Sequence, residues 1–353
     1  MRKLALLFVL AGTGVALIAA AATFAARTHH PSTDVRGTVW AVERFDTGPN
    51  TVTAFDATTG EVRCFATIGK RPIGVTSPRH TGKVYTADER SNQLTVVSKR
   101  DCSILKQIPM GAFPHHMMAG KDGDRLYVGE YGTNKVGVVD TSSDTLVAEW
   151  QASANTLAKT HAVWISKDGE DLFATNEGAT QTAMGTLSKL DAETGTRVWE
   201  VDIGIRPSEV LVTRNGKTAY VTIRNENKVK VLDLRGDLPV QVAEVAIGGQ
   251  PDTMQLTNDG TLVVGLRSIP QMALLDTETL AVRPVTFVGY GISGHQWLSP
   301  GGRYTFIALE STVTIRPGAI AQVDNRSGVV VKTWDYPYGP WPHGVFFDRK
   351  VLR

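Results

Sequence analysis

Residues 113–140 have the sequence FPHHMMAGKDGDRLYVGEYGTNKVGVVD, and this segment decides the fold. A proline opens a short apolar strand, and a turn at Lys121-Asp122-Gly123 follows. A second strand over 125–128 and a third over 135–139 come next, and the third ends at Asp140. Glycine in such a turn suits the positive φ of a tight hairpin. Apolar runs with period-two patterning, bounded by Gly, Asp and Asn, predict strands and not helices.

The same unit recurs roughly every 44 residues, about seven times. The first strand of six units opens near Pro72, Pro114, Thr160, Pro207, Pro251 and Ser293. Repeats of this length with four short strands are typical of a β-propeller, in which each unit forms one blade. We therefore expect an all-β protein with seven blades, each a four-stranded antiparallel sheet.

The two ends of the repeat region complement each other. The region begins at a second strand, near 38–42, and ends with a lone first strand, near 344–347. Pairing these two segments in one blade removes the unpaired edges that an open ring would leave. The sequence thus predicts a propeller over 37–353 whose closing blade combines 38–68 with the C-terminal strand.

The chain resembles the YVTN-type β-propeller repeat family. The resemblance lies in Leu126-Tyr127-Val128 with the run 134–140, and in Ala219-Tyr220-Val221 with the run 227–233. It extends over nearly everything after residue 36. Similar propellers occur among exported binding proteins, lactonases, and the haem d1 or copper-binding propellers of denitrification enzymes. The resemblance therefore implies the fold and leaves the activity open.

The N-terminus has the features of a targeting segment. Arg2 and Lys3 precede an apolar run to about residue 26, with small residues that suit cleavage. The run is also close to the ~20 residues that span a bilayer. We expect 1–26 to be either a signal peptide or an N-terminal membrane anchor, and 27–36 to be a disordered spacer. Either alternative predicts an exported protein: secreted, periplasmic, or anchored to the outer side of the cytoplasmic membrane.

Charge and cysteine content limit the function classes. The net charge is +2 and charged residues make up 20% of the chain, so we expect no nucleic-acid partner. Contact with a membrane is expected only through an uncleaved N-terminal segment, and the propeller is expected to be a monomer. The two cysteines, Cys64 and Cys102, lie on neighbouring predicted blades. They form either a disulfide that staples the closure, as export would allow, or two separate thiols.

Polar residues gather at one predicted end of the ring, which we call the mouth. It contains the connections into the first strands and the loops between second and third strands. Histidines stand near the start of the first strand in four of the seven units: His115, His116, His161, His295 and His343. The loops between second and third strands supply further polar residues: Arg44, Glu89, Glu130, Tyr131, Glu177, Arg224, Arg267 and Glu310.

These residue types indicate two kinds of ligand. Neutral imidazoles from separate strands can share one zinc or copper ion. Arg44, Arg224 and Arg267 can hold a carboxylate or phosphate bidentately. Against a single tight metal site, His115 and His116 are consecutive and on a regular strand would point to opposite faces. A histidine at such a turn also serves simply to cap backbone groups.

Three functions follow as hypotheses. The first is an exported propeller that binds a small molecule, a metal or a protein partner through its histidine-rich mouth. The second is a metal-dependent hydrolase of lactonase type with Glu130 or Glu177 as general base. The third is a copper or haem redox module. The sequence has no CxxCH motif, which excludes covalent c-type haem attachment.

Overall fold

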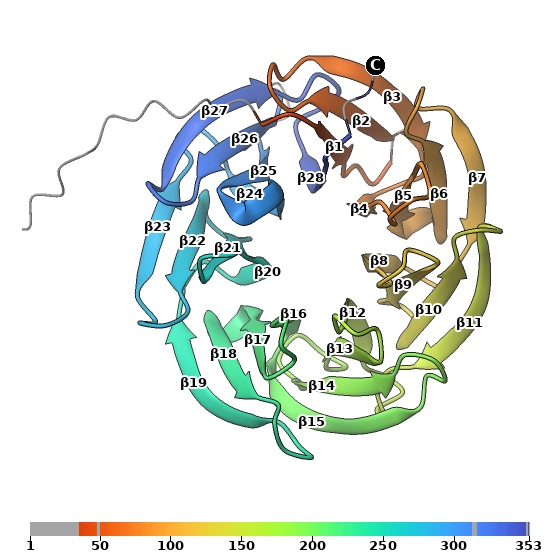
Figure 1. Ribbon diagram of the computed structural model, residues 1–353, viewed down its shortest axis with the longest axis vertical. Helices are drawn as coiled ribbons and strands as arrows, with labels where there is room; N and C mark the ends of the chain where they lie inside the picture. Colours follow the sequence, from red (N-terminus) through yellow and green to blue (C-terminus); the bar gives the residue numbers. More distant parts are fainter. Residues whose placement is uncertain (1–34, 48–49, 313–315, 351, 353) are drawn as a thin grey trace, which may run out of the picture. The chain divides into compact units, whose positions relative to one another are not determined.

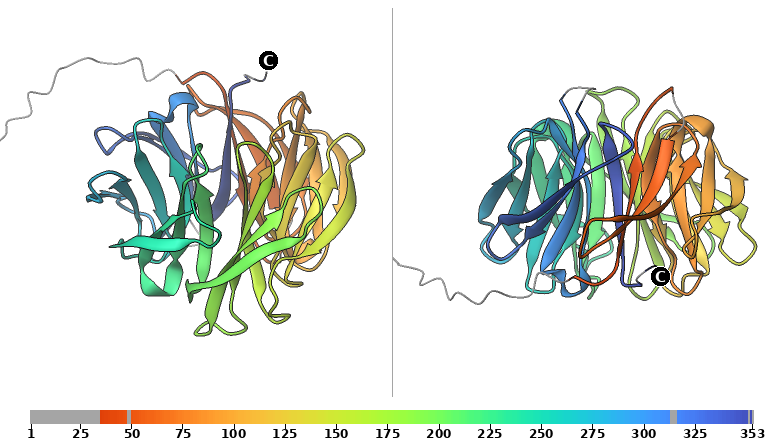
Figure 2. Two further views of the ribbon diagram at one scale, coloured as in Figure 1. Left: turned by 60° about the horizontal axis from the view of Figure 1, so that its bottom comes forward. Right: turned by 90° about the horizontal axis from the view of Figure 1, so that it is seen from above.

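The chain forms a seven-bladed β-propeller, as the repeats predict (Figure 1). The computed structural model describes residues 35–47, 50–312, 316–350 and 352. The predicted signal peptide or anchor, and the predicted spacer up to residue 34, lie outside these ranges. Each blade is one four-stranded antiparallel sheet, and the sheets follow one another around a central axis (Figures 1 and 2).

The first three complete blades follow chain order. Blade one has β4 (Pro72–Thr76), β5 (Lys83–Asp88), β6 (Gln93–Ser98) and β7 (Ile104–Pro109). Blade two has β8 (Pro114–Ala119), β9 (Arg125–Glu130), β10 (Lys135–Asp140) and β11 (Thr145–Gln151). Blade three has β12 (Lys159–Ile165), β13 (Asp171–Glu177), β14 (Met184–Asp191) and β15 (Arg197–Ile205).

The next three blades repeat this order. Blade four has β16 (Pro207–Val212), β17 (Thr218–Ile223), β18 (Lys228–Asp233) and β19 (Val240–Ala246). Blade five has β20 (Pro251–Leu256), β21 (Thr261–Leu266), β22 (Gln271–Asp276) and β23 (Val282–Thr286). Blade six has β24 (Ile292–Leu298), β25 (Tyr304–Glu310), β26 (Ala319–Asp324) and β27 (Val329–Asp335). Three short 3-10 helices complete the described elements: η1 (Glu89–Ser91), η2 (Arg224–Glu226) and η3 (Pro300–Gly302).

Blade seven closes the ring with strands from both ends of the chain. Its order is β28 (Pro342–Asp348), β1 (Thr38–Glu43), β2 (Asn50–Asp56) and β3 (Val62–Ile68). The antiparallel register places Thr38 opposite Asp348. A disulfide between Cys64 in β3 and Cys102, with Cα atoms 5.9 Å apart, joins this blade to blade one. The predicted closure is confirmed, and a covalent link reinforces it.

The hydrophobic core lies between the blades. In blade two, β9 is buried along nearly its whole length, whereas the outermost strand β11 alternates between exposed and partly buried residues. Such alternation is typical of a sheet with one face in solvent. Each core cluster combines neighbouring blades, as when Tyr85 and Leu94 of blade one pack with Leu126 of blade two. Among the described residues, no helix is long and apolar enough to cross a bilayer.

Candidate ligand site at the propeller mouth

The first strand of every blade contains a bulge immediately after it begins. In β8, Pro114 pairs with Glu130 and Met117 pairs with Val128, so three steps along β8 oppose two along β9. The other six first strands show an equivalent shift of register. A bulge leaves the extra residue outside the ladder and redirects its side chain. The bulge residues facing the axis are Ile73, His115, His116, His161, Ser208, Glu209, Asp252, Thr253, His295 and His343.

The bulge overturns one expectation about the histidines. His115 and His116 do not diverge to opposite faces of a regular strand. Their rings stack with centroids 4.8 Å apart and planes at 23°. The alternation rule holds only for a regular ladder, and these two residues lie where the ladder is interrupted. Both imidazoles therefore lie on the axial side of the blade, where each lines a cavity.

A polar cavity of about 140 Å³ occupies the mouth. Its walls include most of the residues predicted for ligand binding or catalysis: Arg44, Glu89, Tyr131, Glu177, Arg224 and Arg267. Four of the five predicted histidines also line it: His115, His161, His295 and His343. Five arginines and three carboxylates line the cavity, so with neutral histidines the lining has a net charge of +2.

Three predicted residues do not line this cavity: His116, which lines a neighbouring chamber, and the two glutamates Glu310 and Glu130. Glu310 is not among the residues lining the cavity, but it accepts hydrogen bonds from Arg267 Nη1 at 2.8 Å and from Arg44 Nη2 at 3.5 Å. Glu130 is fully buried and accepts from the Gly111 backbone N–H at 3.1 Å and from the Thr133 hydroxyl at 2.7 Å. It holds the connection into blade two in place, so its position gives no support to the role of a general base at the mouth.

The five histidines form one continuous cluster across the axis. His115 lies 4.3 Å from His161 between ring centroids, and His116 lies 4.8 Å from His161. His295 continues the cluster, with its centroid 4.6 Å from that of His116 and 4.3 Å from that of His343. In the first three, one ligand nitrogen per residue lies within 4.8 Å of the others. The blades thus bring together histidines that are up to 228 positions apart in the sequence.

These histidines are held in the neutral form. The pKa of His116 is lowered to about 4, first by burial and also by the nearby Arg224 and Arg267 guanidinium groups, against the opposing effect of Asp252. For the other four, burial is likewise the first cause of a pKa well below the usual value, and neighbouring imidazoles or arginines add to it. Neutral imidazole has a free lone pair on one nitrogen, which is the form that binds metals.

Hydrogen bonds identify which nitrogen carries the proton in two of the rings. His161 Nδ1 lies 2.8 Å from the Ser208 carbonyl oxygen, which only accepts, so Nδ1 carries the hydrogen. Its Nε2 lone pair accepts from Arg224 Nη2 at 3.0 Å. His343 Nδ1 lies 2.8 Å from Glu310 Oε1, a carboxylate oxygen, so Nδ1 again is the donor.

Asp252 is a central residue of the site that was not predicted as a ligand-binding residue. It accepts hydrogen bonds from the Ser208 hydroxyl and from Arg224 Nη2, and Arg267 Nε lies 3.6 Å from its Oδ2. Burial alone would raise the pKa of Asp252, but Arg224 and the neighbouring histidines and Arg267 hold it well below the usual value. Asp252 stands at the repeat position that carries histidine in other blades, and this signal could have identified it.

Two further arginines of the mouth were also missed. Arg71 and Arg206 directly precede the prolines that open β4 and β16, with φ of 48° and 58°. Arg206 Nε donates to Glu177 Oε2 at 3.1 Å, and the Tyr131 hydroxyl donates to the same oxygen at 2.8 Å. Both side chains line the cavity, and the same left-handed backbone recurs before the opening proline at Phe113 and Gln250.

The site contains an unusual number of unsatisfied polar atoms. Across the described part of the chain, eleven buried side-chain nitrogen or oxygen atoms have no hydrogen-bond partner. Six belong to residues that line the mouth cavity or a smaller chamber next to it. Of these, Arg71 Nε and Glu89 Oε2 form an ion pair at 3.2 Å, which leaves His115 Nδ1, His116 Nε2, Glu177 Oε1 and Arg224 Nε. Because buried polar groups are normally paired, this concentration indicates a place where a polar ligand completes the network.

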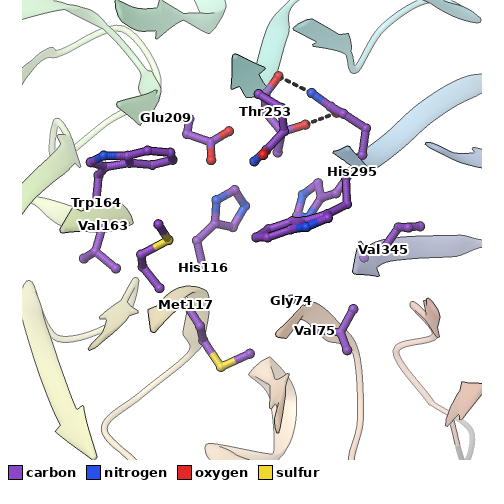
Figure 3. Close-up of a pocket in the computed structure, with 15 residues that line it drawn as sticks. Gly74, Val75, His116, Met117, Val163, Trp164, Glu209, Thr253, His295 and Val345 are labelled. Atoms are coloured by element: carbon purple, nitrogen blue, oxygen red, sulfur yellow. Dashed lines mark hydrogen bonds between the residues drawn. The ribbon is translucent and has the colours of Figure 1, made fainter. Parts of the chain in front are cut away.

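A second, smaller chamber lies on the axis next to the histidine cluster. Its volume is about 60 Å³, and it shares His295 with the mouth cavity. Figure 3 shows His116 and Glu209 pointing into this chamber, with Trp164 at its side. Glu209 Oε2 accepts from the Met254 backbone N–H, and burial raises the pKa of Glu209 well above its usual value. The cluster thus separates a charged mouth from a chamber lined by a carboxyl group whose pKa is raised by burial.

Comparisons with known proteins agree on the fold. The sequence matches no family model and no curated protein, so the YVTN resemblance stays a prediction. The structure is similar to a periplasmic gluconolactonase of Pseudomonas aeruginosa, with a TM-score of 0.68 and 19% identity over 88% of this chain and 99% of that one. It is also similar to Kuenenia stuttgartiensis hydrazine synthase, with a TM-score of 0.64 and 19% identity over 88% and 99%.

A third similar structure is a dihydro-haem d1 dehydrogenase, with a TM-score of 0.61 and 15% identity over 90% of this chain and 76% of that one. The names of these three proteins indicate different functions, although all share the propeller fold with this chain. Identities this low show the fold alone, so function has to be argued from the site.

Proposed function

We propose that this protein is an exported binding protein for a small anionic molecule, bearing a carboxylate or phosphate group, at the propeller mouth. The observation that carries the proposal is the excess of arginine over carboxylate in the lining of the mouth cavity. Arginine holds carboxylates and phosphates through pairs of parallel hydrogen bonds. Arg224 Nε has no partner, so donor capacity remains for a ligand.

The size and polarity of the cavity define the ligand further. Its volume of about 140 Å³ is below the ~300 Å³ at which sites for drug-sized ligands begin, so the ligand has few non-hydrogen atoms. Tyr131, His115 and the other neutral histidines provide groups that can donate to or accept from hydroxyl groups. A small hydroxycarboxylate combines both features.

Calorimetric titration of the tag-free protein with gluconate, malate and inorganic phosphate tests the proposal, with glycerol as the uncharged probe. We expect saturable binding of at least one anion and none of glycerol. Arg44→Gln should weaken that binding, because Arg44 lines the cavity and its guanidinium has one carboxylate partner among the described residues, Glu310 at 3.5 Å. Arg235→Gln is the matched control, because Arg235 is exposed and pairs only with Asp233. Equal affinity in both variants would contradict the proposal.

A lactone hydrolase is the second candidate, and one observation favours it. Glu177 is buried at the cavity wall, and its Oε1 has no hydrogen-bond partner and lies 3.9 Å from both His161 Nε2 and Arg224 Nη1. A carboxylate oxygen in that position can take a proton from an attacking water. A panel of lactones tests this candidate. Hydrolysis by the wild type that is lost in Glu177→Gln would establish the activity. Anion binding without hydrolysis of any lactone would contradict it and support binding as the function.

Two features support export. The predicted leader over 1–26 has a basic start and an apolar run, and Cys64 and Cys102 form a disulfide. Disulfides persist in oxidising compartments outside the cytoplasm. Fractionation of cells producing the full chain tests this: the protein should appear outside the cytoplasm with no free thiol. Recovery from the cytoplasm with two free thiols would contradict export.

A further inference from the structure

We propose that His115, His116 and His161 bind a divalent transition-metal ion of the zinc or copper type, and that Arg224 couples this ion to the anion in the mouth. The metal site stands on the geometry of the histidines alone. The coupling rests on the proposed function, because it requires a bound anion with which Arg224 can form an ion pair.

Two of the three histidines have a buried ring nitrogen without a hydrogen-bond partner. His116 is 8% exposed, and its Nε2 has no hydrogen-bond partner. His115 Nδ1 is also buried without a partner. A buried nitrogen of this kind normally has a partner, and its absence costs stability. A metal ion shared by the two rings supplies that partner.

The separation of the rings suits one ion after small rotations. The ligand atoms of the three histidines lie within 4.8 Å of one another. Nitrogens around a tetrahedral ion with bonds of about 2.1 Å lie roughly 3.4 Å apart. Rotation of the imidazoles by about an ångström at their tips closes this difference without moving the strands. Three imidazoles leave a fourth position open for a water or a ligand.

Two carboxylates near the histidines offset part of the charge of a cation, against the positive charge of Arg224 and Arg267. Glu177 Oε1, which has no hydrogen-bond partner, lies 3.9 Å from His161 Nε2. Asp252 Oδ2 lies 4.0 Å from the Nε2 of His295, whose ring adjoins that of His116. A buried ion without counter-charges would be costly, so these carboxylates are needed for a dication to enter.

The third histidine, His161, has its Nε2 already engaged by Arg224. Nη2 of Arg224 contacts Asp252, the Ser208 hydroxyl at 2.6 Å and His161 Nε2 at 3.0 Å. Nη2 has two hydrogens, so three acceptors compete for them. A metal on His161 Nε2 takes the lone pair that Arg224 uses, and the guanidinium must then give up this contact.

An anion in the mouth favours that release. Arg224 lines the mouth cavity, and its Nε has no partner. Rotation of the guanidinium toward an anion would satisfy Nε and at the same time free His161 Nε2. By linkage, the metal then raises the affinity for the anion by the same factor as the anion raises the affinity for the metal.

The metal site is tested without any anion. Tag-free full-length protein is dialysed against Zn²⁺ or Cu²⁺, and bound metal is measured by elemental analysis and calorimetry. We expect one ion per chain. His116→Gln and His161→Gln should each lower the affinity by more than the roughly 10–100-fold seen on loss of an outer-shell partner. His80→Gln, an exposed histidine outside the site, is the matched control.

Thermal unfolding of each variant separates loss of a ligand from loss of the fold. A variant that unfolds like the wild type and has lost the ion supports the site. Wild-type protein that binds no ion, or a folded His116→Gln variant that binds it unchanged, overturns the site whatever the anion does.

The coupling is tested by repeating the metal titration with the anion that binds, for example gluconate. In the wild type the anion should raise metal affinity about fivefold or more. Arg224→Gln should bind metal more tightly than the wild type without anion, and the anion should then add nothing. Unchanged wild-type metal affinity at saturating anion overturns the coupling. Absence of anion binding to the metal-free protein counts against the proposed function and leaves the metal result standing.

Discussion

His343 donates its Nδ1 hydrogen to Glu310 Oε1 at 2.8 Å, and so connects blade seven to blade six. The same oxygen accepts from Arg267 Nη1 at 2.8 Å. Glu310 is 4% exposed, so it neutralises a buried arginine and orients a buried imidazole at once. This arrangement makes Glu310 a determinant of both the stability of the ring and the charge at the mouth.

Replacing Glu310 by glutamine should separate these two roles. Arg44 would lose its carboxylate partner and Arg267 the nearer of its two, which we expect to lower the free energy of unfolding by about 3 kcal/mol. The mouth would gain a positive charge, so affinity for the anion should rise. Denaturant unfolding and calorimetry measure the two effects. An equal loss of stability in the control Glu278→Gln, at an exposed position, would refute the role of Glu310 in stability.

Glu43 should make stability fall as the pH rises. Burial raises its pKa to about 7, from about 4.5 in the unfolded chain. The folded protein therefore keeps a proton that the unfolded chain releases, and this contribution is full below pH 4.5 and is lost as the pH passes 7. Glu43→Gln should remove it, so the stability difference between variant and wild type should change by roughly 3 kcal/mol between pH 4.5 and 8.

Denaturant unfolding of wild type and Glu43→Gln at several pH values checks this dependence. Glu61→Gln, at an exposed position, controls for the change of residue type. If the wild-type and Glu43→Gln curves stay parallel across this range, Glu43 does not titrate as inferred.

The disulfide should stabilise the closure of the ring. Cys64 and Cys102 are 38 residues apart in sequence, and closing a loop of that length is worth about 4 kcal/mol in the chain-entropy description. We expect the double replacement Cys64→Ala, Cys102→Ala to lower the unfolding free energy by about that amount. A reducing agent should destabilise the wild type and leave the double variant unchanged; the same response in both would contradict the prediction.

Glu209 should tolerate glutamine but not alanine. Because burial keeps its carboxyl group protonated, glutamine resembles the native state and can still accept from the Met254 N–H. Alanine leaves that N–H without its acceptor, at a cost of about 1–3 kcal/mol. Thermal unfolding at pH 7 compares the two variants. Greater destabilisation by glutamine would show that Glu209 is ionised.

The repeat made the fold predictable. The six units that are continuous in the chain each carry a turn glycine and the strand pattern, and six of the seven third strands end at an aspartate, the exception being Ser98 in blade one. The local sequence therefore specifies a blade without knowledge of its neighbours. The closure followed from the same logic, since the segment near Thr38 and the segment near Val345 supply the parts that the other lacks. The structure places β1 beside β28 accordingly.

The sequence predicted which residues lie at the mouth, but it did not predict which of them contact one another. The repeat register placed His161 and Arg224 near the mouth, but their 3.0 Å contact depends on how blade three meets blade four. The packing of one blade against the next is a contact between repeat units, so the pattern within a unit does not specify it. The bulge that brings His115 and His116 together was also invisible, because no residue type marks it.

The seven bulges have a consequence for how such a molecule changes through evolution. Ser208 and Asp252 stand where other blades present histidine, within the same interrupted backbone pairing. Since these positions lie outside the hydrogen-bond ladder, a codon change there alters the chemistry on the axis and leaves the scaffold intact. Lineages can therefore acquire new specificities one blade at a time, without passing through an unfolded ancestor.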